Sequence, residues 1–109
     1  MKQDISISEA IKKKSGMVNI HGWIHRERGS NERKFIQLRD SSGIIQCLLE
    51  KDVVGDKKFE IADKFQVEYS LRIEGEVKED KRSPVGVEIH VKDFEVIGES
   101  HEFPIGKDF

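Results

Sequence analysis

The stretch Lys34-Phe35-Ile36-Gln37-Leu38-Arg39-Asp40 decides the fold, because its residues alternate between apolar and polar character. Such alternation predicts a half-buried strand, with Ile36 and Leu38 pointing into a core. The side chains that share the outer face are then Phe35, Gln37 and Arg39. Asp40-Ser41-Ser42-Gly43 is typical of a tight turn and leads into a second alternating run, Ile44 to Glu50. The segment 33–50 is therefore predicted to be a β-hairpin.

The sequence on either side of this hairpin predicts two helices and three further strands. Ser6-Ile7-Ser8-Glu9 is a capping box that starts a helix over Ile7 to Lys14. Gly22 lies midway along the first strand, where it predicts a bend. The other expected elements are a strand over Met17 to Glu27, a connecting helix from about Asp56, a strand over Tyr69 to Val77, and a last strand over Val87 to Ile97.

Three strands, a helix and two strands is the element order of the OB-fold. We therefore predict an all-β protein: a five-stranded Greek-key barrel with a short N-terminal helix and a connecting helix between its third and fourth strands. An SH3-like barrel is the main alternative. The connecting helix argues against that alternative.

Composition allows one domain and limits where a polyanion could bind. The chain has 109 residues, of which 36% are hydrophobic, enough for one core. Charged residues make up 37%, yet the net charge is only −2, so a basic surface has to be local. Between His25 and Arg39, five basic residues outnumber two acidic ones. No apolar run is long enough for a signal peptide or a membrane span, so we expect a soluble, cytoplasmic protein.

Phe35 lies inside this basic segment, on the outer face of its predicted strand. An exposed ring flanked by Arg33, Lys34 and Arg39 has the composition of a platform on which nucleic-acid bases stack. An exposed phenylalanine by itself needs no special explanation. Its basic neighbours are what point to nucleic acid.

Base discrimination needs polar groups beside the ring, because stacking is indifferent to base identity. Gln46 on the third strand and Arg28 in the first loop are placed to offer hydrogen bonds to a base. The alternative is that both are ordinary surface residues. Trp23, beside the bend at Gly22, is expected to be a core residue at the end of the barrel.

Nothing in the residue pattern predicts catalysis or metal binding. His21 and His25 would lie about 13 Å apart on a strand, too far to share a metal ion. Cys47 alternates with apolar residues and is expected in the core, where it cannot form an internal disulfide as the single cysteine. His90 and His101 lack obvious partners. We expect a binding module without catalytic residues.

Several stretches around the candidate residues form an extended family signature. Besides the hairpin itself, they are Gly22-Trp23-Ile24-His25-Arg26-Glu27-Arg28, Ile73-Glu74-Gly75-Glu76-Val77, Arg82-Ser83-Pro84-Val85-Gly86-Val87-Glu88-Ile89-His90-Val91 and Glu102-Phe103-Pro104-Ile105. Together they resemble the N-terminal anticodon-binding domain of the asparaginyl- and aspartyl-tRNA synthetases. The resemblance covers nearly everything from Val18 to Ile105.

This resemblance implies roles for individual residues. It implies that Phe35 stacks on the central anticodon base, a uracil, and that Gln46 and Arg28 hydrogen-bond that base. It places Glu88 and His90, on the outer face of the last strand, in a region that helps to recognise the first anticodon base. The remaining RNA contacts expected from the basic segment are Arg26 and Arg39.

The resemblance also implies which tRNA is bound. Asparagine and aspartate anticodons share their first two bases, so the central pocket cannot separate them. Ile44-Ile45-Gln46-Cys47 and the ending Phe103-Pro104-Ile105 resemble archaeal or eukaryotic-type asparaginyl enzymes more than aspartyl ones. The expected partner is therefore asparagine tRNA, with aspartate tRNA as the alternative.

The expected division of the chain is an N-terminal helix and lead-in over residues 1–16, an OB-fold over 17–99, and a linker over 100–109. The linker would lead to a catalytic domain that this sequence lacks, and ATP and Mg²⁺ are implied for that domain only. The parent ligase is expected to be a homodimer and the isolated domain a monomer. A stand-alone OB-fold protein that binds single-stranded nucleic acid is the other alternative.

Overall fold

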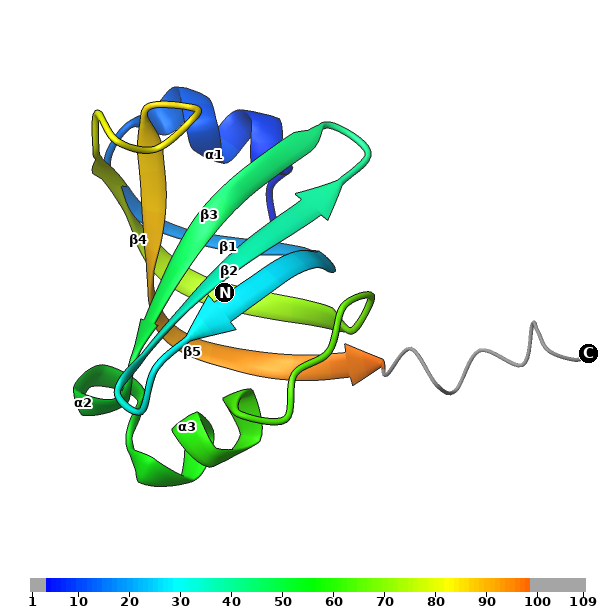
Figure 1. The fold of residues 1–109 in the computed structure, drawn as a ribbon. Helices are drawn as coiled ribbons and strands as arrows, with labels where there is room; N and C mark the ends of the chain where they lie inside the picture. Colours follow the sequence, from blue (N-terminus) through cyan, green and yellow to red (C-terminus); the bar gives the residue numbers. More distant parts are fainter. Residues whose placement is uncertain (1–3, 99–109) are drawn as a thin grey trace, which may run out of the picture.

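The computed structural model describes residues 4–98, and its five strands close into one barrel (Figure 1). Neighbouring strands follow the order β1-β2-β3-β5-β4, in which β3 and β5 are parallel and the other pairs are antiparallel. The predicted five-stranded OB-fold barrel is confirmed. Its elements are α1 (Ile7–Lys13), β1 (Gly16–Gly29), β2 (Arg33–Asp40), β3 (Gly43–Glu50), α2 (Lys51–Val54), α3 (Asp56–Ala62), β4 (Ser70–Glu79) and β5 (Val87–Gly98).

The connection between β3 and β4 differs in one respect from the prediction of a single helix. It contains two short helices, α2 and α3, separated by Gly55. Gly55 has φ 93°, a left-handed value that favours glycine and interrupts helical geometry. The helix α3 starts at Asp56, as predicted.

Helix α1 has only seven residues, too few to be stable in isolation, and is held by its cap and by burial. The Ser6 hydroxyl accepts a hydrogen bond from the Glu9 backbone N–H at 3.1 Å, and the Glu9 carboxylate accepts one from the Ser6 N–H at 3.1 Å. This capping box is the predicted one. The helix ends one residue earlier than expected, because Lys14 adopts a left-handed conformation at φ 65°.

Asp40 joins α1 to the turn between β2 and β3. Its carboxylate accepts hydrogen bonds from the backbone N–H of Ile7 at 2.9 Å, of Ser42 at 2.7 Å and of Gly43 at 3.1 Å. Partial burial acts to raise the pKa of Asp40. The hydrogen bonds outweigh that effect, so the pKa lies below the usual value for aspartate.

Strand β1 serves both halves of the barrel, as its central glycine predicts. Residues 16–23 pair with β4, and residues 23–29 pair with β2. At the crossover, a Cβ atom on Gly22 would lie 2.2 Å from the carbonyl oxygen of Arg39, so only glycine allows the two strands to approach this closely.

A β-bulge interrupts β1 between Ile24 and Arg26, and the sequence pattern does not predict it. The extra residue reverses the inside-outside alternation of the strand. Beyond the bulge, Arg26 lies opposite Gln37 and Arg28 lies opposite Phe35. The bulge thus brings both arginines to the outer face that carries Phe35.

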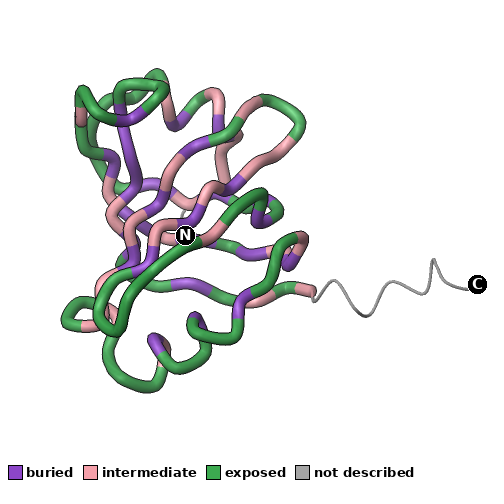
Figure 2. The backbone as a smooth tube through the Cα atoms, in the orientation of Figure 1, coloured by how far each residue is buried: buried purple, intermediate pink, exposed green. Residues whose placement is uncertain are grey.

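The core contains alternate residues of all five strands, visible as repeated buried positions along each strand in Figure 2. The two ends of the barrel are covered by helices (Figure 1). Helix α1 contributes Ile7 and Ala10 to the core, and α3 contributes Phe59 and Ala62. No helix within residues 4–98 is long and apolar enough to cross a membrane.

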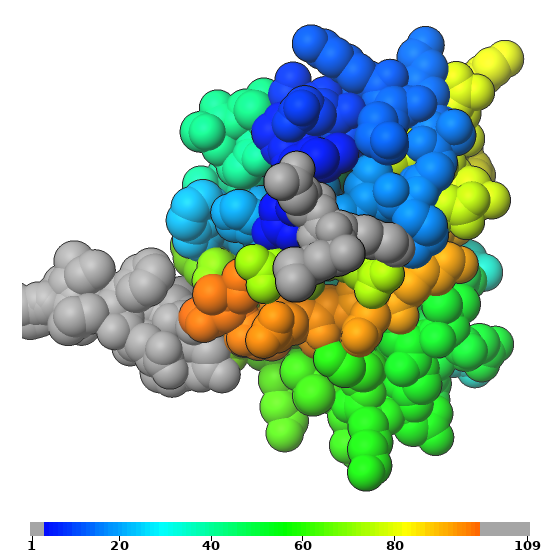
Figure 3. Space-filling view, turned by 180° about the vertical axis from the view of Figure 1, so that it is seen from behind, coloured from blue at the N-terminus to red at the C-terminus, as the bar shows by residue number. Residues whose placement is uncertain are grey.

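The molecule presents two different faces. Seen from behind, Figure 3 shows α1 and the start of β1 in blue above β5 in orange, with the α2–α3 segment in green below. Strands β2 and β3 lie nearest the viewer in Figure 1. The outer surface of these two strands carries Phe35 and Gln46, and the neighbouring strands β1 and β5 carry Arg28 and Glu88. The predicted linker over 100–109, with His101, lies outside the described residues.

Candidate nucleic-acid interface

The residues Arg28, Phe35 and Gln46 come together on three neighbouring strands. Arg28 of β1 lies directly opposite Phe35 of β2, and Gln46 of β3 lies opposite Gln37 of β2. They share a hollow of about 420 Å³. Its lining is Arg26, Glu27, Arg28, Phe35, Gln37, Gln46 and Val67. Four residues predicted to contact RNA, Arg26, Arg28, Phe35 and Gln46, therefore line one hollow.

The guanidinium of Arg28 covers the ring of Phe35, with its Cζ atom 4.5 Å from the ring centroid. Sequence reasoning placed Arg28 beside the ring, not over it. The sequence predicted an exposed ring, but Phe35 is only half-exposed, in part because this guanidinium covers it. A base stacked on this face of the ring, a contact worth about 1–3 kcal/mol, would take the place of the guanidinium, whose N–H groups would then be free to donate to the base.

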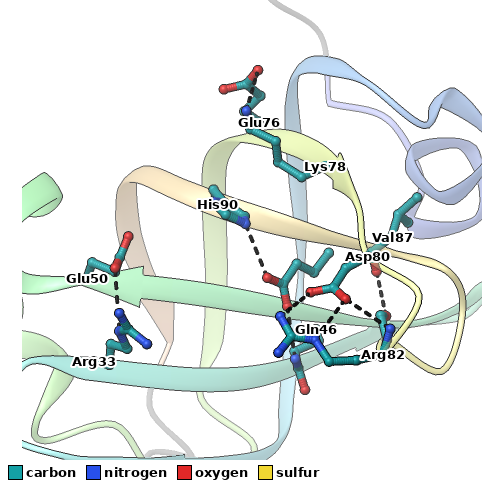
Figure 4. Close-up of polar contacts among 11 residues, drawn as sticks. Arg33, Gln46, Glu50, Glu76, Lys78, Asp80, Arg82, Val87 and His90 are labelled. Carbon is teal, nitrogen blue, oxygen red and sulfur yellow. Dashed lines mark hydrogen bonds and ion pairs between the residues drawn. The ribbon is translucent and has the colours of Figure 1, made fainter.

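Gln46 also contacts β5, through Glu88 (Figure 4). The Gln46 amide nitrogen donates to one carboxylate oxygen of Glu88 at 3.0 Å, and His90 Nε2 lies 3.1 Å from the other. Glu88 and His90 share the outer side of β5, as predicted. Glu88 is not exposed there, because its side chain is only 8% accessible. It is buried among its neighbours and does not project toward solvent.

The loop between β4 and β5 forms a second wall of the site. Asp80 accepts hydrogen bonds from the Arg82 side chain at 3.3 Å and backbone at 2.9 Å, and these bonds lower the pKa of Asp80. The Ser83 hydroxyl donates to the Val87 carbonyl oxygen at 2.6 Å. This loop borders a second hollow, of about 320 Å³, which Phe35 and Gln46 also line. Its lining is Arg28, Arg33, Phe35, Gln46, Leu48, Asp80, Arg82, Ser83 and Glu88.

Sequence reasoning missed this loop as part of the site. A third hollow of about 210 Å³ also touches it, lined by Gln37, Ile44, Gln46, Ser83, Pro84 and Val85. A usable signal was present, because OB-folds bind oligonucleotides between the loops that follow strands one and four. Arg82 in the polar loop after the fourth strand fits that rule.

Arg39 lies apart from the other predicted site residues. It is four positions from Phe35 on β2, about 13 Å along the strand. Its Nη2 atom contacts both carboxylate oxygens of Glu68 at 2.7 Å, and its guanidinium lies 5.9 Å from the ring of Trp23. Arg39 lines none of the three hollows around Gln46. Its neighbour Trp23 is 37% exposed, so the prediction that this residue belongs to the core is wrong.

Lys34 corrects the description of the basic segment. Its side chain is only 9% exposed and shares the inner side of β2 with Ile36 and Leu38. The ammonium group lies 3.2 Å from Glu27 and 3.8 Å from Asp63. The prediction that Lys34 flanks Phe35 at the surface is wrong, because alternation along the strand turns it inward toward two carboxylates.

Two further features, Cys47 and a hollow around Arg72, are not part of this interface. Burial, together with the negative charge of Glu88, raises the pKa of the Cys47 thiol, and the residue lies in the core as predicted. Within residues 4–98, no three His, Cys, Asp or Glu side chains form a group that could hold a metal ion. A further hollow of about 340 Å³ is lined by four carboxylates and one arginine, Arg72. This excess of negative charge disfavours binding of a phosphate backbone.

A closed five-stranded barrel with an aromatic ring, arginines and an amide on its β1–β3 surface defines an oligonucleotide-binding module of the OB type. Comparison with known proteins agrees, since a family model described as OB-fold nucleic acid binding domain matches residues 18–97. The chain belongs to this family.

Similar proteins include aminoacyl-tRNA synthetases. The asparagine–tRNA ligase of Pyrococcus horikoshii is 43% identical over 88 residues, which are 81% of this chain and 20% of that protein. The ligase of Thermoplasma acidophilum is 42% identical over 91 residues, 84% of this chain and 21% of that protein. This chain therefore spans about a fifth of the length of these relatives, and the predicted resemblance is confirmed.

Solved structures agree with the sequence comparison. The crystal structure of the asparaginyl-tRNA synthetase from Pyrococcus horikoshii complexed with asparaginyl-adenylate has a TM-score of 0.85 and 37% identity, covering 99% of this chain and 25% of that chain. The aspartyl-tRNA synthetase from Entamoeba histolytica has a TM-score of 0.81 at 23% identity, covering 91% of this chain and 22% of that chain. The second likeness bears on the fold alone.

Proposed function

We propose that this domain binds the anticodon loop of an asparagine tRNA and reads its central uracil with Phe35, Arg28 and Gln46. The observation that carries the proposal is the convergence of these three side chains, from three strands, on one hollow. The identity of 42–43% to asparagine–tRNA ligases favours asparagine over aspartate tRNA. Aspartate tRNA remains the alternative.

In this proposal each residue has a separate task. The ring of Phe35 holds the base by stacking, which every base can do. Arg28 leaves the ring and donates N–H groups to the carbonyl oxygens of uracil. Gln46 meets the edge of the base between those oxygens. Arg26 and Arg82, at the borders of the hollows, supply positive charge for the phosphates of the loop.

The proposal extends to the longer protein in which such a domain functions. Residues 1–16 form the helix and lead-in, 17–99 the anticodon-binding domain, and 100–109 a linker toward a catalytic domain. The parent protein is proposed to be an ATP-dependent asparagine–tRNA ligase, using Mg²⁺ in its catalytic domain. This domain then contributes tRNA selection and no chemical step.

Replacing Phe35 by alanine tests the proposal. We expect the affinity for a fluorescently labelled asparagine anticodon stem-loop to fall by about 5- to 160-fold, the equivalent of about 1–3 kcal/mol for one stacked base. Fluorescence anisotropy at fixed salt concentration measures the change. Trp23→Ala is the matched control, because Trp23 is an exposed aromatic residue that lines none of the three hollows around Gln46. The affinity of this variant for the stem-loop should stay within twofold of wild type.

Stem-loops that differ only in the central base complete the test. The wild-type domain should prefer uracil at that position. Equal binding to all four central bases would refute the proposal. If unstructured pyrimidine DNA also bound equally well, with a steep dependence on salt, the domain would be a general single-strand binder.

A further inference from the structure

Gln46 and Glu88 are fixed side by side by the parallel pairing of β3 and β5. The two residues are direct partners in that pairing, so their side chains leave the sheet on the same face. The Gln46 Nε2 atom lies 3.0 Å from the carboxylate of Glu88. The second carboxylate oxygen lies 3.1 Å from Nε2 of His90, which holds the carboxylate from its other side.

The chemistry of this contact sets which way the Gln46 amide faces. A carboxylate only accepts hydrogen bonds, so the amide group that faces it has to be the NH₂ group. The carbonyl oxygen then points away from β5. Since β3 lies between β5 and β2 in the barrel, this oxygen is turned toward the β2 side, which carries Phe35. Figure 4 shows the Gln46 nitrogen on the dashed line and its oxygen on the opposite side.

The burial of Glu88 restricts the Gln46 amide to one orientation. The Glu88 side chain is only 8% exposed, so water is a poor substitute for its partners. Turning the Gln46 amide over would set its carbonyl oxygen against the nearer carboxylate oxygen of Glu88 and leave these two oxygens facing each other without a donor between them. Such a mismatch between buried polar groups is unfavourable. The amide therefore has one stable orientation before any RNA arrives.

We propose that Glu88 is a positioning residue that fixes the Gln46 carbonyl oxygen as the acceptor facing the bound base. This inference rests on the proposed function and names the basis of its base preference. Uracil presents N3–H, a donor, at the centre of its pairing edge, whereas cytosine presents the unprotonated N3, an acceptor. The fixed oxygen of Gln46 accepts from uracil and repels cytosine, although the two bases have the same size. Glu88 thus acts through Gln46 and does not contact the base.

The variant Glu88→Gln tests this role with little change in volume. A glutamine at position 88 can either donate or accept, so it stabilises both orientations of the Gln46 amide. We expect wild type to bind a central-uracil stem-loop about 5- to 160-fold more tightly than a central-cytosine one, the range for one mismatched buried hydrogen bond. In Glu88→Gln this ratio should fall to within about threefold, mainly through tighter binding of the cytosine stem-loop.

Glu76→Gln is the matched control, because Glu76 contacts Lys78 on β4 and lines none of the three hollows. Its uracil-to-cytosine ratio should equal that of wild type. If wild type discriminates and Glu88→Gln discriminates equally well, the positioning role is refuted while the proposed function stands. If wild type itself shows no preference, the proposed function fails.

A second variant covers the case in which Glu88→Gln does not fold, as judged by circular dichroism. Glu88→Asp keeps the charge but shortens the side chain, which withdraws the acceptor from Gln46. The ratio should fall in this variant as well. An unchanged ratio in a folded Glu88→Asp protein would equally overturn the inference.

Discussion

Replacing Gly22 by alanine tests the crossover that lets β1 pair with both β4 and β2. The added Cβ would lie 2.2 Å from the carbonyl oxygen of Arg39 and 3.0 Å from its carbonyl carbon. Both are backbone atoms, so no side-chain rotation relieves the contact. Normal separation requires β1 and β2 to move apart by about 1 Å, which takes hydrogen bonds of ordinary length beyond their useful range.

The expected loss of stability follows from the pairs next to the crossover. Trp23 pairs with Arg39. This pair is the hydrogen-bonded one, because the Ile24 N–H and carbonyl oxygen bond to Tyr69 and Glu68 instead and antiparallel pairs alternate. Losing the two backbone hydrogen bonds of this pair, at about 1–3 kcal/mol for each bond, gives a loss of about 2–6 kcal/mol. Domains of this size have about 5–15 kcal/mol in total, so Gly22→Ala removes a large part of the free energy of unfolding.

Urea denaturation followed by circular dichroism measures this loss. With a slope of about 1–3 kcal/mol per molar urea, the midpoint should fall by about 1 M or more. Gly43→Ala is the matched control, because its Cβ would meet only Ile7 and Ile11 side-chain atoms at 3.7 and 3.9 Å, ordinary contacts. If the free energies of unfolding of Gly22→Ala and Gly43→Ala differ by less than about 1 kcal/mol, the size of one hydrogen bond, the close approach at Gly22 does not require glycine.

Two further predictions concern buried or bonded charges. Lys34→Met should leave the free energy of unfolding within about 1 kcal/mol of wild type or raise it, because apolar replacement of a buried ion pair is often neutral or stabilising. Glu27→Ala should lower the free energy of unfolding by about 1–3 kcal/mol, because it removes the nearer of the two carboxylates beside the buried Lys34 ammonium. Urea denaturation that ranked the two variants the other way would contradict this. Because the pKa of Asp40 is lower in the folded protein than the usual value of about 3.9, its contribution to stability is present above that value and is lost as the pH falls through the lower folded pKa. The melting temperature of wild type should therefore fall more between pH 5 and pH 2.5 than that of Asp40→Asn, as measured by circular dichroism, and parallel curves would show that the carboxylate contributes nothing.

Local sequence patterns were enough to predict most of the fold, because strands, turns and helix caps are each indicated by residues only a few positions apart. Period-2 alternation predicted β2 and β3, and the turn at Asp40 to Gly43 joined them. The capping box predicted the start of α1, and Gly22 marked the point where β1 changes partner. The strand order of the barrel followed from the order of these elements.

The burial of individual polar residues was not predictable in the same way. Alternation along β2 would have placed the Lys34 side chain inward, but its charge suggested the surface. The two carboxylates that pair with the Lys34 ammonium come from β1 and from the end of α3. Trp23 was expected at the end of the core because it lies beside the bend at Gly22, yet its side chain is exposed on β1. In both cases the deciding factor is which groups lie nearby in space.

The amino-acid sequence was enough to predict a five-stranded barrel and to place Phe35 and Gln46 on the outer surface of its second and third strands. It placed Arg28 in the first loop, whereas the structure has Arg28 within β1. How the three side chains are held depends on contacts between segments that are distant in the sequence. The bulge after Ile24 turns Arg28 toward Phe35, and the pairing of β3 with β5 brings Glu88 to Gln46 across 42 residues of sequence. Hydrogen bonds between distant segments leave no periodic trace in a chain, because they depend on how strands pair and not on the spacing of residues within one strand.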